Sequence, residues 1–316
     1  MTSTTALRFT AAAGGIGGVF YWRMNQSVPL VNPPRLVSSL PSEVKLNNVT
    51  LYQYESCPFC RKVRGVLDYS GVPYKIVEVH PLTKAETKPF AAEYGKVPIL
   101  TVSSGNDNYQ LRDSSRIIEN VLLTTSGPLK PSPATVGRPL GPKTWKVDDE
   151  PSIEDEWVRW TDARLVQLIV ANIYCNLGES KETFNYLLTH DKFNWFSKMA
   201  VLWSGTVVMT MVASKRRKTL GLEKGQEREA LYDAIRMFLD TGLAKHPFLG
   251  GDSPNKADFN IYGVMRSIEG FSTQSDLFQN VSEFGFWYSR MEAAVGDSMA
   301  VAHENAGARG EVALDL

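Results

Sequence analysis

The chain has 316 residues, of which 43% are hydrophobic and 22% are charged, so it is long enough for two domains that each bury a core. Lys and Arg balance Asp and Glu at 34 each, so no net charge favours nucleic acid, and no nucleic-acid partner is expected. The three cysteines do not form the pattern of a secreted disulfide framework. A reducing, intracellular compartment is therefore expected, either an organelle that an N-terminal leader specifies or otherwise the cytoplasm.

Residues 1–47 are predicted to form a leader outside the folded domains. The first 42 residues contain three Arg, no Asp or Glu, and many Ser, Thr and Ala, which is the composition of an organelle transit peptide. The apolar stretch from Phe9 to Trp22 is shorter than the roughly 20 residues that span a bilayer. Three interpretations stay open: a mitochondrial or other organelle leader, a weak anchor that gives peripheral membrane association, and a disordered tail.

Residues 48–125 are predicted to form an α/β domain. β-branched and aromatic runs alternate with helix-compatible runs, separated by Gly, Pro and polar turns. The predicted strands are 49–54, 74–79, 97–102 and 109–111, and the predicted helices are 61–69, 84–94 and 113–122. The order βαβαββα is that of a thioredoxin-like domain.

The second half of the chain is predicted to be all-α. Prolines crowd residues 126–152, which are expected to be an extended linker. Residues 153–300 have helical periodicity, and Trp157, Trp160 and Trp203 are expected to be core residues. The sequence Asn255 to Asp258 predicts a helix capping box. Residues 301–316 are expected to be a tail.

An apolar run at 199–213 has two interpretations. It is shorter than a bilayer span and is interrupted by Ser, Gly and Thr, which favours a buried core helix over a transmembrane helix. The basic residues 215–218 then close that helix, where cations complement the helix dipole.

The chemistry is expected at Cys57-Pro58-Phe59-Cys60. Cys57 falls at a strand-to-helix turn, where the helix dipole and unpaired N–H groups favour a thiolate. Arg61, Lys62 and Arg64 add positive charge, and Glu55 opposes them. Cys60, one turn later, is placed to resolve a mixed disulfide at Cys57. A zinc half-site and two buried structural cysteines are the competing interpretations, although the four histidines do not have ligand spacing.

Two further elements complete a predicted tripeptide site. In thioredoxin-like folds the proline at the position of Pro98 is cis, and the backbone of the preceding residue, here Val97, pairs with a peptide-like ligand. Asp113 and Ser114 open a helix whose N–H groups can hold a carboxylate, while Asp113 meets an ammonium group. This pairing fits the γ-glutamyl end of glutathione, and a plain helix N-cap is the alternative for Asp113-Ser114.

Taken together, these motifs resemble the membrane-associated prostaglandin E synthase type 2 family. The resemblance covers about residues 48–292. Its first-domain motifs are residues 51–54, 57–60, 62–64, 96–100 and 113–115, and its second-domain motifs are residues 157–166, 172–174, 214–216, 248–251 and 262–264.

The resemblance implies a glutathione-transferase-like architecture that is usually dimeric, with glutathione and, in a second state, haem as cofactors. It implies isomerisation of prostaglandin H2, a lipid endoperoxide, to prostaglandin E2 at the Cys57 thiol. Tyr54 and Phe59 would line the site, Cys60 would support the thiol, and haem iron would bind at Cys57. A glutathione-dependent thiol-disulfide oxidoreductase or transferase, and a haem- or glutathione-binding protein without isomerase activity, are the alternatives.

Overall fold

The computed structural model describes residues 32–81, 83–125, 133, 135–140, 151–175 and 209–305. Most of the leader, the linker and the tail lie outside these residues, as do Trp203 and most of the apolar run at 199–213. In the part of the chain that is described, no helix has the length and apolar character needed to cross a bilayer.

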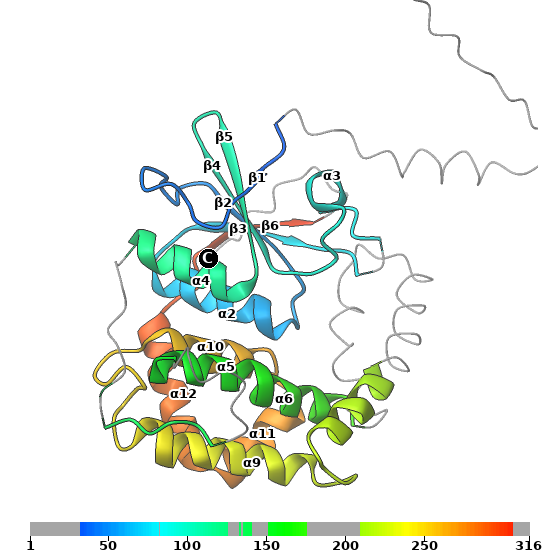
Figure 1. Ribbon diagram of the computed structural model, residues 1–316, viewed down its shortest axis with the longest axis vertical. Coiled ribbons are helices and arrows are strands. Elements are labelled where there is room, and N and C mark those ends of the chain that lie inside the picture. The colour runs from blue at the N-terminus through cyan, green and yellow to red at the C-terminus, as the bar shows by residue number, and fades with distance from the viewer. Residues whose placement is uncertain are drawn as a thin grey trace, which may run out of the picture.

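A six-stranded sheet forms the first domain, in the order β1-β5-β4-β2-β3-β6 (Figure 1). Its four inner strands are β2 (Val49–Gln53), β3 (Tyr74–Glu78), β4 (Ile99–Ser104) and β5 (Asp107–Arg112). β2 runs parallel to β3 and antiparallel to β4, and β4 and β5 form a hairpin. The helices between them are α2 (Pro58–Tyr69), α3 (Lys88–Ala91) and α4 (Ser114–Thr125). The predicted thioredoxin-like order βαβαββα is confirmed.

Alternation along the strands decides which helix covers which face of the sheet. Leu51 is fully buried and belongs to the same apolar cluster as Val63 of α2 and Ile117 of α4. Tyr52 points to the opposite face, where its ring meets Phe90 of α3 at 5.1 Å between centroids. Figure 1 shows α2 and α4 between the sheet and the helical domain, so the N-terminus of α2 is close to the second domain.

Helix α3 is shorter than the predicted helix at 84–94. Lys84 has a φ of 50°, in the left-handed region, which a continuing right-handed helix does not allow. Residues 84–87 therefore form a turn, and the helix begins at Lys88 with Pro89 in its first turn.

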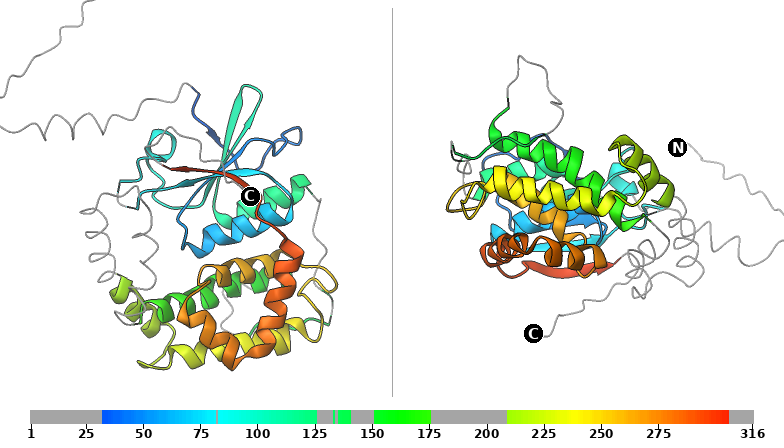
Figure 2. Two further views of the ribbon diagram at one scale, coloured as in Figure 1. Left: turned by 180° about the vertical axis from the view of Figure 1, so that it is seen from behind. Right: turned by 90° about the horizontal axis from the view of Figure 1, so that it is seen from below.

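Two edge strands move the predicted domain boundaries. β1 (Arg35–Leu36) pairs in parallel with β5, and Leu40, Val44 and Leu46 are buried, so the predicted leader of residues 1–47 includes part of the folded domain. β6 (Ala300–Asn305) pairs in parallel with β3, so residues predicted as the end of the helical domain and the tail return to the sheet. Figure 2 shows this return after the last helix. Neither short segment has a periodicity that identifies it as a strand.

The second domain is helical, as predicted. Its elements are α5 (Ile153–Trp160), a π-helical turn η1 (Thr161–Leu165), α6 (Val166–Ile173), α9 (Glu227–Met237), a π-helical turn η2 (Phe238–Leu243), α10 (Lys256–Arg266), α11 (Ser272–Asn280) and α12 (Ser282–Val295). Residues 209–219 are also helical and include the basic residues 215–218.

Aromatic side chains form the centre of the helical domain. Trp157 meets Trp160 at 5.1 Å and Phe238 at 5.8 Å, and Phe238 meets Trp287 at 5.0 Å, all in edge-to-face geometry. The predicted core role of Trp157 and Trp160 is confirmed. The capping box at the start of α10 is also confirmed, because the Asn255 and Asp258 side chains accept each other's backbone N–H groups.

The two domains pack along α2 and α10. The rings of Tyr69 and Phe259 lie 4.7 Å apart across this contact. A Cβ atom at Gly65 would meet the Tyr262 ring at 3.6 Å, so the small residue brings α2 close to α10. The helix that carries the Cys57 turn is therefore held by both domains.

Candidate functional site

Cys57 is the N-cap of α2, and Pro58 occupies the first turn of that helix. The Cys57 carbonyl accepts the N–H groups of Cys60 and Arg61, each at 3.0 Å, and the Cys57 N–H donates to the carbonyl of Tyr54 at 3.0 Å. The Cys57 side chain is half-buried, whereas Cys60 is fully buried, and neither forms a disulfide. The predicted strand-to-helix position of the thiol is confirmed.

The surroundings of the two cysteines shift the pKa values of their thiols in opposite directions. A hydrogen bond from the Cys60 thiol is the main cause that lowers the pKa of Cys57, with the backbone N–H groups of Cys60 and Phe59 adding to it against the effect of burial. Burial and the same hydrogen bond raise the pKa of Cys60 well above its usual value. Cys57 is therefore the more acidic thiol, as the sequence analysis expected, and Cys60 is a protonated donor beside it.

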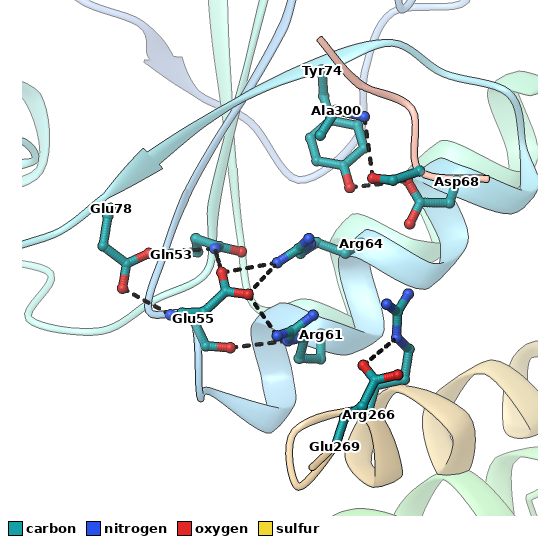
Figure 3. Close-up of polar contacts among 11 residues, drawn as sticks. Gln53, Glu55, Arg61, Arg64, Asp68, Tyr74, Glu78, Arg266, Glu269 and Ala300 are labelled. Atoms are coloured by element: carbon teal, nitrogen blue, oxygen red, sulfur yellow. Dashed lines mark hydrogen bonds and ion pairs between the residues drawn. The ribbon is translucent and has the colours of Figure 1, made fainter. Parts of the chain in front are cut away.

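Arg61 and Arg64 of α2 were expected to add positive charge near Cys57, but both pair with Glu55. Arg61 lies 2.6 Å and Arg64 lies 2.9 Å from the carboxylate oxygens of Glu55, so both guanidinium groups share this one carboxylate, which offsets part of their positive charge (Figure 3). Gln53 donates to the same carboxylate at 2.8 Å. The acidity of Cys57 consequently depends on Cys60 and the helix N-terminus more than on the arginines.

Tyr54 and Phe59 flank the thiol turn. Burial, followed by the charges of Cys57 and Cys60, raises the pKa of Tyr54 to about 12, so its phenol stays a proton donor near neutral pH. The Phe59 ring lies 5.1 Å from the Lys62 ammonium group. Both side chains therefore border the Cys57 turn, and their contacts with a ligand stay a prediction.

The Val97-Pro98 peptide bond is cis, as predicted. Pro98 is buried, Val97 is half-buried, and both precede the first residue of β4. Within the described part of the chain, the backbone of Val97 forms no hydrogen bond to another backbone group. Its N–H and C=O groups are therefore not used by the sheet.

Asp113 is a helix N-cap. Its carboxylate accepts the N–H groups of Ser115 at 3.0 Å and Arg116 at 3.3 Å, and its φ is 76°. Asp113 is nevertheless exposed, while Ser114 is buried at the start of α4. The capping interpretation is thus confirmed for Asp113, and the binding of a γ-glutamyl group by the pair stays a prediction.

From the sequence, Lys62 was named only as one of the positive charges near Cys57, and no partner was predicted for it. The Lys62 side chain is fully buried and forms an ion pair with Asp162 of the π-helical turn η1 in the second domain. Burial lowers the pKa of Lys62, but charges on Asp162, Cys57 and Asp113 oppose this effect. A π-helical turn often occurs at a functional site, but no sequence signal marked this one.

Tyr174 is a second contribution of the helical domain. It is the C-cap of α6 and is buried. Burial, and after it the charge of Cys57, raises the pKa of its phenol, so this side chain lies near the thiol. From the sequence, Tyr174 was known only as part of the resemblance motif 172–174. Its position near Cys57 depends on how the two domains pack, which the local sequence does not reveal.

Comparison of the chain with known proteins identifies the family to which it belongs. The family model for the glutathione S-transferase N-terminal domain matches residues 51–128. Prostaglandin E synthase 2 of Mus musculus is 33% identical over 93% of this chain and 82% of its own length. This chain belongs to the prostaglandin E synthase 2 family. The family member of Danio rerio is 34% identical over 81% of this chain and 73% of its own length.

Solved structures also resemble this member of the prostaglandin E synthase 2 family. FzlA from C. crescentus is 17% identical, with a TM-score of 0.45 over 78% of this chain and 88% of that chain.

Proposed function

We propose that the protein catalyses glutathione-associated isomerisation of prostaglandin H2 to prostaglandin E2 at the Cys57 thiol. The observation that carries the proposal is the pairing of the two cysteines: Cys57 has a lowered pKa at a helix N-terminus, and the protonated Cys60 donates to it. Membership of the prostaglandin E synthase 2 family supplies the reaction class, an isomerase.

Three groups of the first domain would suit glutathione. Val97 has backbone N–H and C=O groups that the sheet does not use, and a peptide-like ligand can pair with such groups as a strand does. The exposed carboxylate of Asp113 suits the ammonium group of a γ-glutamyl end, and the start of α4 at Ser114 suits its carboxylate. Phe59 and Pro98 would complete the surface against which the tripeptide lies.

The chemistry needs no external oxidant. The Cys57 thiolate attacks one oxygen of the endoperoxide, so an S–O bond forms, the O–O bond breaks, and the other oxygen becomes an alkoxide. Loss of the proton from the carbon that bears the sulfur-bound oxygen forms the ketone and returns the electron pair of the S–O bond to sulfur. The Tyr54 phenol, protonated at neutral pH, would protonate the alkoxide, and the phenolate so formed would accept the proton lost from carbon, so no proton is gained or lost overall.

Haem is the second cofactor that the resemblance implies. The donor that the turn offers to an iron is the Cys57 sulfur, because Cys60 is fully buried. Bound haem would supply redox chemistry of its own at that sulfur, and the isomerisation proposed here uses none of it.

Thiol-disulfide exchange with glutathione is the second candidate function. The hydrogen bond between Cys60 and Cys57 favours it, because the same proximity allows Cys60 to attack a mixed disulfide at Cys57. The test is to assay the purified full chain, with glutathione, on prostaglandin H2 and on a small mixed disulfide. Cys57→Ser should abolish both reactions, whereas Cys60→Ser should abolish dithiol exchange and largely retain isomerisation. Retention of isomerisation by Cys57→Ser would overturn the proposal.

A further inference from the structure

Two carboxylates meet where β2 and β3 end, beside the thiol turn (Figure 3). Glu78, the last residue of β3, accepts the N–H of Glu55 at 2.8 Å. The side-chain amide of Gln53 lies between the carboxylates, 2.8 Å from Glu55 and 3.4 Å from Glu78. The Tyr54 carbonyl, next in the chain to Glu55, accepts the N–H of Cys57 at 3.0 Å. Glu78 is thus connected to the thiol through one short turn.

The two carboxylates have unequal partners. Glu55 pairs with Arg61 and Arg64, and these contacts lower its pKa against the effect of burial. Glu78 forms no ion pair with a described residue, and its hydrogen bonds come from one backbone N–H and one neutral amide. Burial, with a further contribution from the Glu55 charge, raises the pKa of Glu78 to about 7. Glu78 therefore changes its charge near neutral pH.

The charge of Glu78 reaches the reactive groups. It opposes ionisation of Cys57, Cys60 and Tyr54, and for Cys57 it is a minor effect against the larger ones that lower the pKa. The other charged groups that face Glu78 are Glu55 from the turn and Arg64 from α2. On its other side, β3 pairs with β6, where Asn305 is in register with Glu78.

We propose that Glu78 is a positioning residue for Cys57. Its carboxylate accepts the Glu55 N–H and so fixes the turn that carries the thiol. Its negative charge opposes formation of the thiolate at Cys57. The inference rests on the proposed function for its importance to catalysis. It concerns a residue of β3 that contributes no atom to the reaction.

The test compares Glu78→Gln with the wild-type chain by the rate at which iodoacetamide alkylates Cys57 between pH 5.5 and 9.5, with the modified cysteine identified by mass spectrometry. Gln keeps an oxygen for the Glu55 N–H and loses the charge. Below pH 6 the wild-type Glu78 is itself protonated, so the two rates should agree. Near pH 7.5 the variant should react about twofold faster or more, and the rates should converge again where Cys57 is fully ionised.

Glu86→Gln is the matched control. The Glu86 carboxylate also accepts a backbone N–H, that of His80 at 2.8 Å, and its charge also affects Tyr54. Its alkylation profile should equal that of the wild-type chain. Identical profiles for Glu78→Gln and the wild type, or equal changes in both variants, would overturn the proposal.

A measurement on the wild-type chain covers the case in which Glu78→Gln does not fold. Alkylation of Cys57 with neutral iodoacetamide prevents the thiolate from forming, so by reciprocity the Glu78 carboxyl should titrate at lower pH, as followed by carboxyl ¹³C NMR. An unchanged titration would contradict the inference. These readouts require neither glutathione nor prostaglandin H2. The proposed function and the effect of Glu78 on Cys57 are therefore tested independently, and either one can be wrong while the other is right.

Discussion

Gly263 of α10 lies against the backbone of Lys62 of α2, so closely that a Cβ atom at Gly263 would stand 2.3 Å from the Lys62 Cα atom and 2.5 Å from its nitrogen. No rotamer change relieves a contact with backbone atoms. The helix that begins at the Cys57 turn is therefore seated on the second domain at a position that tolerates only glycine.

We expect Gly263→Ala to separate α2 from α10 and to lower the free energy of unfolding by about 1–3 kcal/mol, the usual cost of overpacking. Gly285→Ala is the control, because Gly285 lies within α12 and its Cβ atom would meet nothing within 4 Å. The control should be neutral or slightly stabilising. Urea denaturation of both variants measures the difference, and equal stability of the two would contradict the contact.

The ion pair of Lys62 with Asp162 should stabilise the contact between the domains. Asp162→Asn leaves a fully buried ammonium group without its counter-charge, so we expect a loss of about 2 kcal/mol, less than for a fully buried pair because 35% of the Asp162 side chain is exposed. Lys62→Met removes the charge together with its desolvation cost and should lose less.

Asp233→Asn is the control for this pair, because it breaks an exposed ion pair with Arg236 and should leave stability unchanged. Denaturant midpoints compare the three variants. A larger loss in Lys62→Met than in Asp162→Asn would indicate that packing of the Lys62 chain matters more than its charge.

Cys60 should control the acidity of Cys57. Its thiol donates the hydrogen bond that lowers the pKa of Cys57, so Cys60→Ala should raise that pKa and slow alkylation of Cys57 at neutral pH. The decrease should be on the order of tenfold, as expected for a hydrogen bond to a charged group. Cys60→Ser keeps a donor and should lose less, and Cys175→Ser should change nothing. A pH profile that is the same in all three variants would remove Cys60 from this role.

Asp113 should have separable roles in stability and in binding. Asp113→Ala removes the N-cap of α4 and should cost about 1 kcal/mol, whereas Asp113→Asn keeps the cap and tolerates the positive φ. If the carboxylate meets the ammonium group of glutathione, Asp113→Asn should still weaken glutathione binding in calorimetry. Ser152→Ala, which removes the N-cap of α5, should lower stability without an effect on binding. Unchanged affinity in Asp113→Asn would leave only the capping role.

Glu78 should also make stability depend on pH. Its pKa is about 7 in the folded chain, above the ordinary value of 4.5, so the folded state holds this proton more tightly than the unfolded state. The resulting stability is fully present below pH 4.5 and is lost as the pH rises through 7. Relative to Glu78→Gln, the wild-type free energy of unfolding should fall by up to about 3 kcal/mol across this range. A constant difference between the two proteins would contradict the raised pKa.

Local patterns were sufficient for much of the site. The strand ending at Gln53, the Pro58 helix start and the cis Pro98 each depend on residues that are neighbours in the chain. The same holds for the Asp113 cap and the Asn255–Asp258 capping box. Turn, cap and strand preferences depend on only a few neighbouring residues, so these features can be predicted from the sequence alone.

The tertiary structure decided which charges the thiol experiences. The sequence placed Arg61 and Arg64 near Cys57, but the fold directs both to Glu55 and brings Glu78 from another strand, Lys62 with Asp162 from η1, and Tyr174 from α6. Edge strands β1 and β6 are likewise formed only by partners far away in the chain. The physical reason is that side-chain electrostatics depend on distance and burial in three dimensions, whereas hydrophobic periodicity reports only which face of one element is covered.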